Sequence, residues 1–204
     1  MNDDNEVEWF TICDEKNIIL KKNDNNVYKI TLDVDIKNNE DTVLNILKNG
    51  QLFDLLFALN PDVIDKFDII EQNDIHNVFI TFKNCESTHD KENNDGEDDK
   101  VVRVFFALKY TFKENKCIIE SQEESHDELT HSSCSEIAKI RGQNDFISVS
   151  KIKLKATEKV TENNKKTFIS LTFKVRNKKS SNIINMYIGL YFKKIFYRFK
   201  QYFE

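Results

Sequence analysis

Residues 182–203 read NIINMYIGLYFKKIFYRFKQYF, a sequence that predicts a long helix with one broad apolar face. Aliphatic and aromatic side chains recur in it every three or four residues, as they do along one side of a helix. The expected apolar stripe consists of Ile184, Tyr187, Ile188, Tyr191, Ile195, Phe199 and Tyr202. Such a helix must be covered along most of its length, so the rest of the chain has to supply a surface that receives it.

Alternating sequences upstream of this helix predict strands with one buried face. VYKITLDVDI and TFISLTFKVR place their apolar residues on one face, namely Tyr28, Ile30, Leu32, Val34 and Ile36 in the first and Ile169, Leu171, Phe173 and Val175 in the second. In FISVSKIKLKAT (146–157) the apolar residues change from odd to even positions after Val149, and a β-bulge would produce that change. Further strands are expected at 8–14, 17–22, 67–72, 76–83, 101–112 and 117–125.

Two short helices are predicted after the third strand. In NNEDTVLNILKNG, Asp41 is a suitable N-cap and Gly50 is a suitable C-terminal stop. QLFDLLFAL predicts a second helix, which Asn60 and Pro61 end because the residue before a proline avoids the helical conformation. The two helices therefore interrupt the run of strands.

The predicted order is three strands, two short helices, six antiparallel strands and one long C-terminal helix. This order favours an α+β fold in which a curved antiparallel sheet wraps around the C-terminal helix and leaves room for an apolar cavity. We expect a single domain over residues 1–204, with an acidic loop at 85–100 and a second long loop at 126–145. Loops of that length in a compact domain are mostly functional or disordered.

Charge is distributed unevenly along the chain. The formal net charge is −5, yet residues 145–204 hold 14 Lys and Arg against 4 Asp and Glu. A basic C-terminal third could approach anionic lipid or nucleic acid, although such an excess often only solvates a surface. The four cysteines lack paired spacing and no run of eighteen apolar residues occurs, so we expect a reducing, cytoplasmic setting without a membrane span.

Motifs for catalysis are absent from the sequence. His76, His89, His126 and His131 are scattered, and neither a nucleophile elbow nor a Gly-rich phosphate loop occurs. We therefore expect no enzyme activity, no metal and no cofactor. The aromatic residues of YFKKIFYRFK recur at the spacing of a buried helix face, whereas base stacking needs exposed rings, so nucleic acid is not the expected partner.

Three segments resemble the START domain, the steroidogenic acute regulatory protein-related lipid-transfer domain, which has a helix-grip fold. EWFTICDEKNIILKK is similar to the opening of that family. LFDLLFALNPDVIDKFDIIEQND is similar to the stretch that leads to its usual Trp-Asp, here Phe67-Asp68. RVFFALKYTFKENKCIIESQEESHDEL is similar to its Arg-Asp-Phe-Val strand and the following strand. The resemblance rests on the order and spacing of these segments from Trp9 to about Phe203.

The chain departs from the family pattern at three places. Val104 replaces the Asp of the Arg-Asp-Phe-Val strand, so Arg103 lacks a local charge partner. Residues 85–100 are acidic where the family often offers apolar side chains to a bilayer, and anionic lipid would repel them. The long helix that usually precedes the Trp is also absent before Trp9.

The resemblance implies a lipid carrier whose internal cavity is gated by the C-terminal helix, with a phospholipid or sterol as ligand. We expect a monomer, cytoplasmic and peripheral to membranes, that transfers lipid between them. The expected lipid-binding residues are Arg103, Phe105, Lys109, Tyr187 and Tyr191. The expected residues for docking on an anionic membrane are Lys193, Lys194, Arg198 and Lys200, which could equally just solvate the helix. The alternative function is a protein-interaction module that uses the same fold without a transferable lipid.

The direction of two cations stays open at this point. Alternation along RVFFALKYTF places Arg103 and Lys109 opposite the apolar face of Val104 and Phe106, which sends them to solvent. The resemblance implies instead that the residue at the position of Lys109 points into the cavity.

Overall fold

The computed structural model describes residues 7–36, 42–72, 74–83, 102–121, 146–161, 165–176 and 182–204. The two loops expected at 85–100 and 126–145 lie outside these residues. None of the described helices is both long and apolar enough to cross a membrane.

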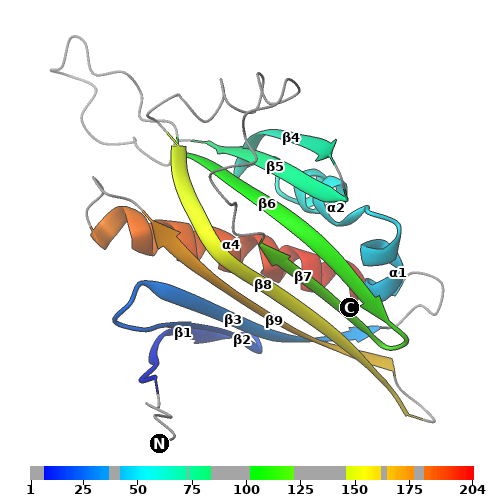
Figure 1. Ribbon diagram of the computed structural model, residues 1–204. Helices are drawn as coiled ribbons and strands as arrows, with labels where there is room; N and C mark the ends of the chain where they lie inside the picture. The colour runs from blue at the N-terminus through cyan, green and yellow to red at the C-terminus, as the bar shows by residue number, and fades with distance from the viewer. Residues whose placement is uncertain are drawn as a thin grey trace, which may run out of the picture.

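Within the described residues, nine strands form one curved sheet. They are β1 (Phe10–Glu15), β2 (Ile18–Lys22), β3 (Val27–Ile36), β4 (Ile64–Gln72), β5 (Ile75–Phe82), β6 (Val102–Lys113), β7 (Lys116–Ser121), β8 (Phe146–Val160) and β9 (Lys165–Arg176). Their order across the sheet is β1-β2-β3-β9-β8-β7-β6-β5-β4, and neighbours in this order are antiparallel. The sheet curves around helix α4 (Asn182–Phe203) (Figure 1), which confirms the expected architecture.

The alternation of β3 and β9 is confirmed. All five apolar residues of β3 and all four of β9 that were assigned to one face are buried against the helix side. The two strands pair along their whole length, from Val27 with Lys174 to Ile36 with Lys165. A continuous apolar floor therefore forms because the buried sets of neighbouring strands share a face.

The predicted bulge lies in β8. Between the pairs Ser150–Lys174 and Lys153–Thr172, β8 contains one residue more than β9, and Lys151 adopts a φ of 53°. Val149 before the bulge and Ile152 after it are both buried. The extra residue therefore absorbs the change from odd to even positions and bends the strand.

The short helices are α1 (Val43–Lys48) and α2 (Leu52–Leu59). The N-cap of α1 is Thr42, whose hydroxyl accepts a hydrogen bond from the backbone N–H of Asn45 at 3.1 Å, so the expectation for Asp41 was one residue early. Gly50, with a φ of 71°, follows the C-cap of α1 as predicted. The side chain of Asn60 is buried and donates a hydrogen bond to the Leu56 carbonyl at 2.8 Å, which ends α2.

Helix α4 has the predicted bounds, but its buried face is rotated from the predicted stripe. The buried face consists of Ile188, Phe192, Ile195, Phe196, Phe199 and Phe203. Tyr187 and Tyr202 were assigned to it wrongly, because their side chains are 50% and 49% exposed. A tyrosine at the border of a buried face can keep its ring against the protein and its hydroxyl in water. The side chain of Ile184 lies outside the described residues.

The helix lies against β3 through a glycine. A Cβ atom on Gly189 would come within 2.8 Å of Cδ1 and 2.9 Å of Cε1 of Tyr28, closer than non-bonded carbons approach. Tyr28 is fully buried and stacks on Phe173 at 5.4 Å between ring centroids. Gly189 therefore sets how closely α4 can approach the sheet.

We predict that Gly189→Ala destabilises the fold. Helix propensity alone would favour alanine by roughly 0.5–1 kcal/mol, but the displaced Tyr28 ring is expected to cost about 1–3 kcal/mol. Urea unfolding measures the net change. In a Tyr28→Leu background, Gly189→Ala should lower the free energy of unfolding by less. An equal loss in both backgrounds would show that the contact with Tyr28 does not cause the destabilisation.

Candidate functional site

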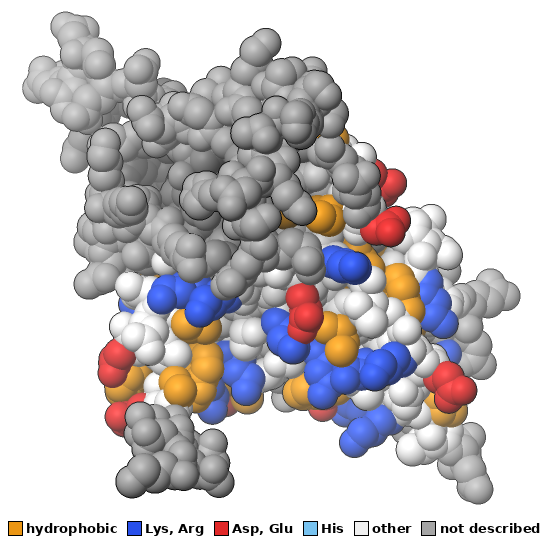
Figure 2. Space-filling model, viewed as in Figure 1, with side chains coloured by type: hydrophobic (Ala, Val, Ile, Leu, Met, Phe, Trp, Pro, Cys, Tyr) orange, Lys and Arg blue, Asp and Glu red, His pale blue; other side chains and the backbone are white. Residues whose placement is uncertain are grey.

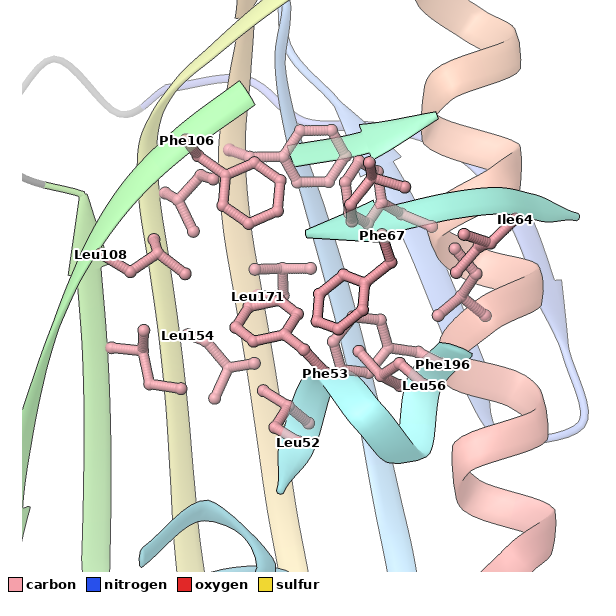
Figure 3. Close-up of a pocket in the computed structure, with 16 residues that line it drawn as sticks. Leu52, Phe53, Leu56, Ile64, Phe67, Phe106, Leu108, Leu154, Leu171 and Phe196 are labelled. Atoms are coloured by element: carbon pink, nitrogen blue, oxygen red, sulfur yellow. The ribbon is translucent and has the colours of Figure 1, made fainter. Parts of the chain in front are cut away.

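An apolar cavity lies between the concave face of the sheet and helices α2 and α4. Its volume is about 50 Å³. The lining consists of Leu52, Phe53, Leu56, Ile64, Phe67, Ile80, Phe106, Leu108, Ile119, Ile152, Leu154, Leu171, Phe173, Phe192, Ile195 and Phe196. Figure 3 shows side chains from α2, β4, β6, β8, β9 and α4 converging on this space. Every lining side chain is aliphatic or aromatic, so the site offers a ligand dispersion contacts and desolvation.

A series of aromatic rings connects the cavity with the surface beside α2. Phe53 stacks on Phe67 at 5.8 Å and packs against Phe106 at 5.9 Å, and all three line the cavity. Phe67 also stacks on Phe57 at 6.0 Å, whose side chain is 38% exposed. The corner where α2 meets β4 therefore carries apolar side chains from the interior to the surface.

Polar contacts on one flank tie α4 to β1. The Lys193 ammonium donates to a Glu15 carboxylate oxygen at 2.9 Å and to the Cys13 sulfur at 2.7 Å. The neighbouring Lys16 donates to the Tyr197 hydroxyl at 2.8 Å. The hydrogen bond from Lys193 and its charge lower the pKa of Glu15 below its ordinary value. These contacts hold the helix from the side of the first hairpin.

On the other flank, α4 is tied to the corner after α2 by the Asp62 cluster, which consists of Asp62, Lys194 and Arg198. Lys194 donates to Asp62 at 3.0 Å, and Arg198 donates to both carboxylate oxygens, with Nη2 at 2.9 Å. The hydrogen bonds from Arg198 and Lys194 hold the pKa of the Asp62 carboxyl well below its usual range. The same pairing raises the pKa of Arg198. A bidentate arginine pair of this kind is directional as well as attractive.

Comparisons with known proteins concern this arrangement of sheet, helix and cavity. No family model matches the chain, and no curated protein matches its sequence. The solved lipid transfer and protein localization domain of human StarD13 (DLC2) matches with a TM-score of 0.57 at 12% identity, over 97% of this chain and 90% of that one. The chain has the helix-grip fold of START domains.

Two further structures agree with this START fold. Human StAR-related lipid transfer protein 5 matches with a TM-score of 0.57 at 8% identity, over 96% of this chain and 86% of that one. A StAR-related lipid transfer protein from Xanthomonas axonopodis matches with a TM-score of 0.53 at 9% identity, over 96% and 98%. At such identities the likeness concerns the fold, so the site has to be argued from the residues of this chain.

The START resemblance placed Lys109 in the cavity, and the structure corrects this. Val104, Phe106 and Leu108 are buried, whereas Lys109 is exposed. An unpaired ammonium inside an entirely apolar lining would lose its hydration without compensation, so the apolar face of β6 takes the concave side. The side chains of Arg103 and Phe105 lie outside the described residues.

The two tyrosines expected in the site do not line the cavity. Tyr187 is half exposed, and Tyr191 is partly buried where it stacks on Phe82 at 5.3 Å. Phe192 and Phe196 occupy the cavity wall of α4 instead. Phe106 and Leu108 could have been found from the alternation of β6, since they belong to the face that pattern alone assigned to the interior.

The four α4 cations expected to dock on a membrane all have partners within the chain. Lys200 is only 5% exposed, and its ammonium donates to the Asp33 carbonyl at 2.6 Å and to the Glu204 carboxylate. Lys193 and Arg198 are 13% and 29% exposed at their side chains, and only Lys194 reaches about half. The expectation of a solvated basic patch is therefore wrong for Lys200, and the docking role of the others stays a prediction.

Metal ligands do not gather among the described residues, where no group of three or more His, Cys, Asp and Glu could hold an ion. His76 lies 3.1 Å from Glu71 and against the Tyr110 ring. The remaining histidines lie outside the described part of the chain.

We predict that Asp62→Asn loosens α4. Asp62 and Lys194 are each about half exposed, so the expected decrease in the free energy of unfolding at pH 7 is up to about 1 kcal/mol. A carboxylate with a lowered pKa stabilises the fold above its unfolded pKa of about 3.9, and this contribution disappears as the pH falls. The difference between parent and variant in urea unfolding should therefore narrow below about pH 4.

Asp65→Asn is the matched control. Asp65 is exposed on the same corner and makes no ion pair with a described residue. Its variant should match the parent at each pH, and an equal loss for both variants would show that the Asp62 cluster does not hold the helix.

Proposed function

We propose that this chain binds a lipid in the apolar cavity beneath α4 and carries it between membranes. The observation that supports the proposal is the uniformly apolar lining, formed by sixteen residues from the sheet and two helices. Burial of hydrocarbon in such a site contributes roughly 0.8 kcal/mol per methylene. The START neighbours bear lipid transfer in their names, which agrees with this use of the fold.

The lining favours an apolar ligand body. No lining residue has a polar side chain, so an acyl chain or a sterol ring system suits the cavity better than a headgroup does. The headgroup of a phospholipid, or the hydroxyl of a sterol, would remain near the polar contacts around α4. The proposed role is binding and carriage, without a catalytic step.

Uptake would require the wall of α2 and α4 to move. Ligand pockets usually measure roughly 300–1,000 Å³, so a cavity of about 50 Å³ would have to widen before it could hold a lipid. The sheet side is fixed by long backbone ladders, whereas α4 is held to β1 and to the α2 corner by side chains. Docking of Lys194 and Arg198 on an anionic bilayer would take them from Asp62, which would couple docking to opening.

We predict that Leu171→Phe weakens lipid binding because the larger ring fills the cavity. A fluorescent fatty-acid or phospholipid analogue should bind at least about tenfold more weakly, a loss of about 1.4 kcal/mol. Leu32→Phe is the control, since Leu32 is equally buried on the neighbouring β3 but does not line the cavity. The control should lose about 1–3 kcal/mol of stability and keep its affinity.

Lipid extraction and native mass spectrometry of the purified chain test the proposal as a whole. A co-purifying lipid, or uptake from vesicles, is expected. Loss of uptake in Leu171→Phe with uptake retained in Leu32→Phe would place the ligand in the cavity, and the reverse order would overturn that placement.

The second candidate function is a protein-interaction module that uses the helix-grip fold without a lipid. The small cavity favours it, because the described side chains already fill most of the interior. A purified chain that neither contains nor takes up any lipid, even after Asp62→Asn loosens α4, would support this function over the carrier.

A further inference from the structure

The convex face of the sheet carries a cluster of lysines on the side away from α4. We call Lys113, Lys116, Lys153, Lys155 and Lys174 the lysine face. They lie at the end of β6 and on β7, β8 and β9, and alternate with buried residues such as Cys117, Leu154 and Phe173. Figure 2 views this face, where Lys and Arg side chains gather and acidic side chains are sparse.

Among the described residues, one of the five lysines of the lysine face has an acidic partner. Lys153 pairs with Glu120 on the adjacent strand. Lys113, Lys116, Lys155 and Lys174 make no ion pair with a described carboxylate. Partial desolvation and the neighbouring charges of Lys155, Lys113 and Lys153 lower the pKa of Lys116. Repulsion among these lysines does not stabilise the isolated fold, whereas binding of an anionic partner would reduce it.

The lysine face extends over the middle strands of the curved sheet. β8 is the fifth of nine strands in the sheet order, with β7 and β9 beside it. Two apolar side chains lie among the lysines: Ile118, which pairs with Lys155, and Phe168, which is 43% exposed. Lys153 and Lys155 lie along β8, and Lys113 and Lys116 flank the turn between β6 and β7 at one end of the same convex face. A flat anionic surface could therefore contact them together.

We propose that the lysine face docks the chain on an anionic membrane surface. Lysine ammonium groups are compact point charges that need no fixed arrangement of phosphates, whereas nucleic-acid recognition favours the planar fork of arginine. Lysine stems and the side chains of Ile118 and Phe168 suit the boundary between headgroups and hydrocarbon. The α4 cations, by contrast, already have partners within the chain.

Docking through the lysine face goes beyond lipid carriage, because it does not involve the cavity. The sheet lies between this face and α4 (Figure 1), so a docked chain keeps α2, α4 and the Asp62 cluster directed away from the bilayer. The face would hold the chain at one membrane while the helix remains free to open toward another surface.

The test is sedimentation of the chain with phosphatidylcholine vesicles that contain or lack phosphatidylserine, at low salt. Each lysine near an anionic leaflet raises binding roughly fivefold. The triple variant Lys113→Gln, Lys116→Gln, Lys155→Gln should therefore bind on the order of 100-fold more weakly than the parent. Added salt should release the parent, and vesicles without phosphatidylserine should not bind it.

The matched control changes three exposed lysines outside the lysine face: Lys48→Gln, Lys66→Gln and Lys83→Gln. It removes the same charge and should bind vesicles about as the parent does. An equal loss in both triple variants would reduce the effect to net charge and overturn the proposal, as would parent-like binding of the lysine-face variant.

Two further measurements separate the remaining explanations. Urea unfolding should show the lysine-face variant to be no less stable than the parent, because repulsion around Lys116 is relieved. Tighter binding of the parent to duplex DNA than to anionic vesicles at the same salt would assign the face to nucleic acid and overturn the proposal. Sedimentation does not depend on lipid uptake, so a parent that binds vesicles but takes up no lipid would leave the docking intact.

Discussion

Helix α4 lies close to the sheet because Gly189 has no side chain where it meets the ring of Tyr28. Phe192 packs against Phe173 at 4.8 Å, the next residue, Lys193, reaches β1 on one flank, and Arg198 reaches Asp62 on the other. The position of α4, and with it the cavity wall and the polar contacts, therefore depends on the close approach of Gly189 to Tyr28.

The two walls of the cavity differ in what holds them. One wall is a nine-stranded sheet whose central strands are joined by backbone hydrogen bonds over ten or more residues. The other wall consists of α2 and α4, held by stacked rings and by exposed or half-exposed ion pairs. Local opening follows the weaker contacts, so any change in cavity volume would come from the helical wall.

Alternation in the sequence predicted the sheet well because burial of one face fixes the register of a strand. It predicted the inward residues of β3 and β9, and even the bulge of β8. It failed where a side chain has both apolar and polar parts. Tyr187 counted as apolar but lies at the border of the buried face, and Lys200 counted as solvated but is buried with a carbonyl partner. Such partners come from distant segments, which no local pattern contains.

The bulge at Lys151 shows that the direction of the side chains of β8 and the bend of the strand are determined separately. A chain without this one residue would run from Ser150 directly to Ile152, and every inward side chain of β8 would stay inward. Its central strand would nevertheless be straighter, because bulges bend the strand that carries them. The alternation of polar and apolar residues thus determines which face of β8 is exposed to solvent, whereas the extra residue of the bulge determines how strongly the sheet can curve around the helix. Among related chains, a single-residue deletion here would restore strict alternation along β8, keep the same inward residues and still change the shape of the interior.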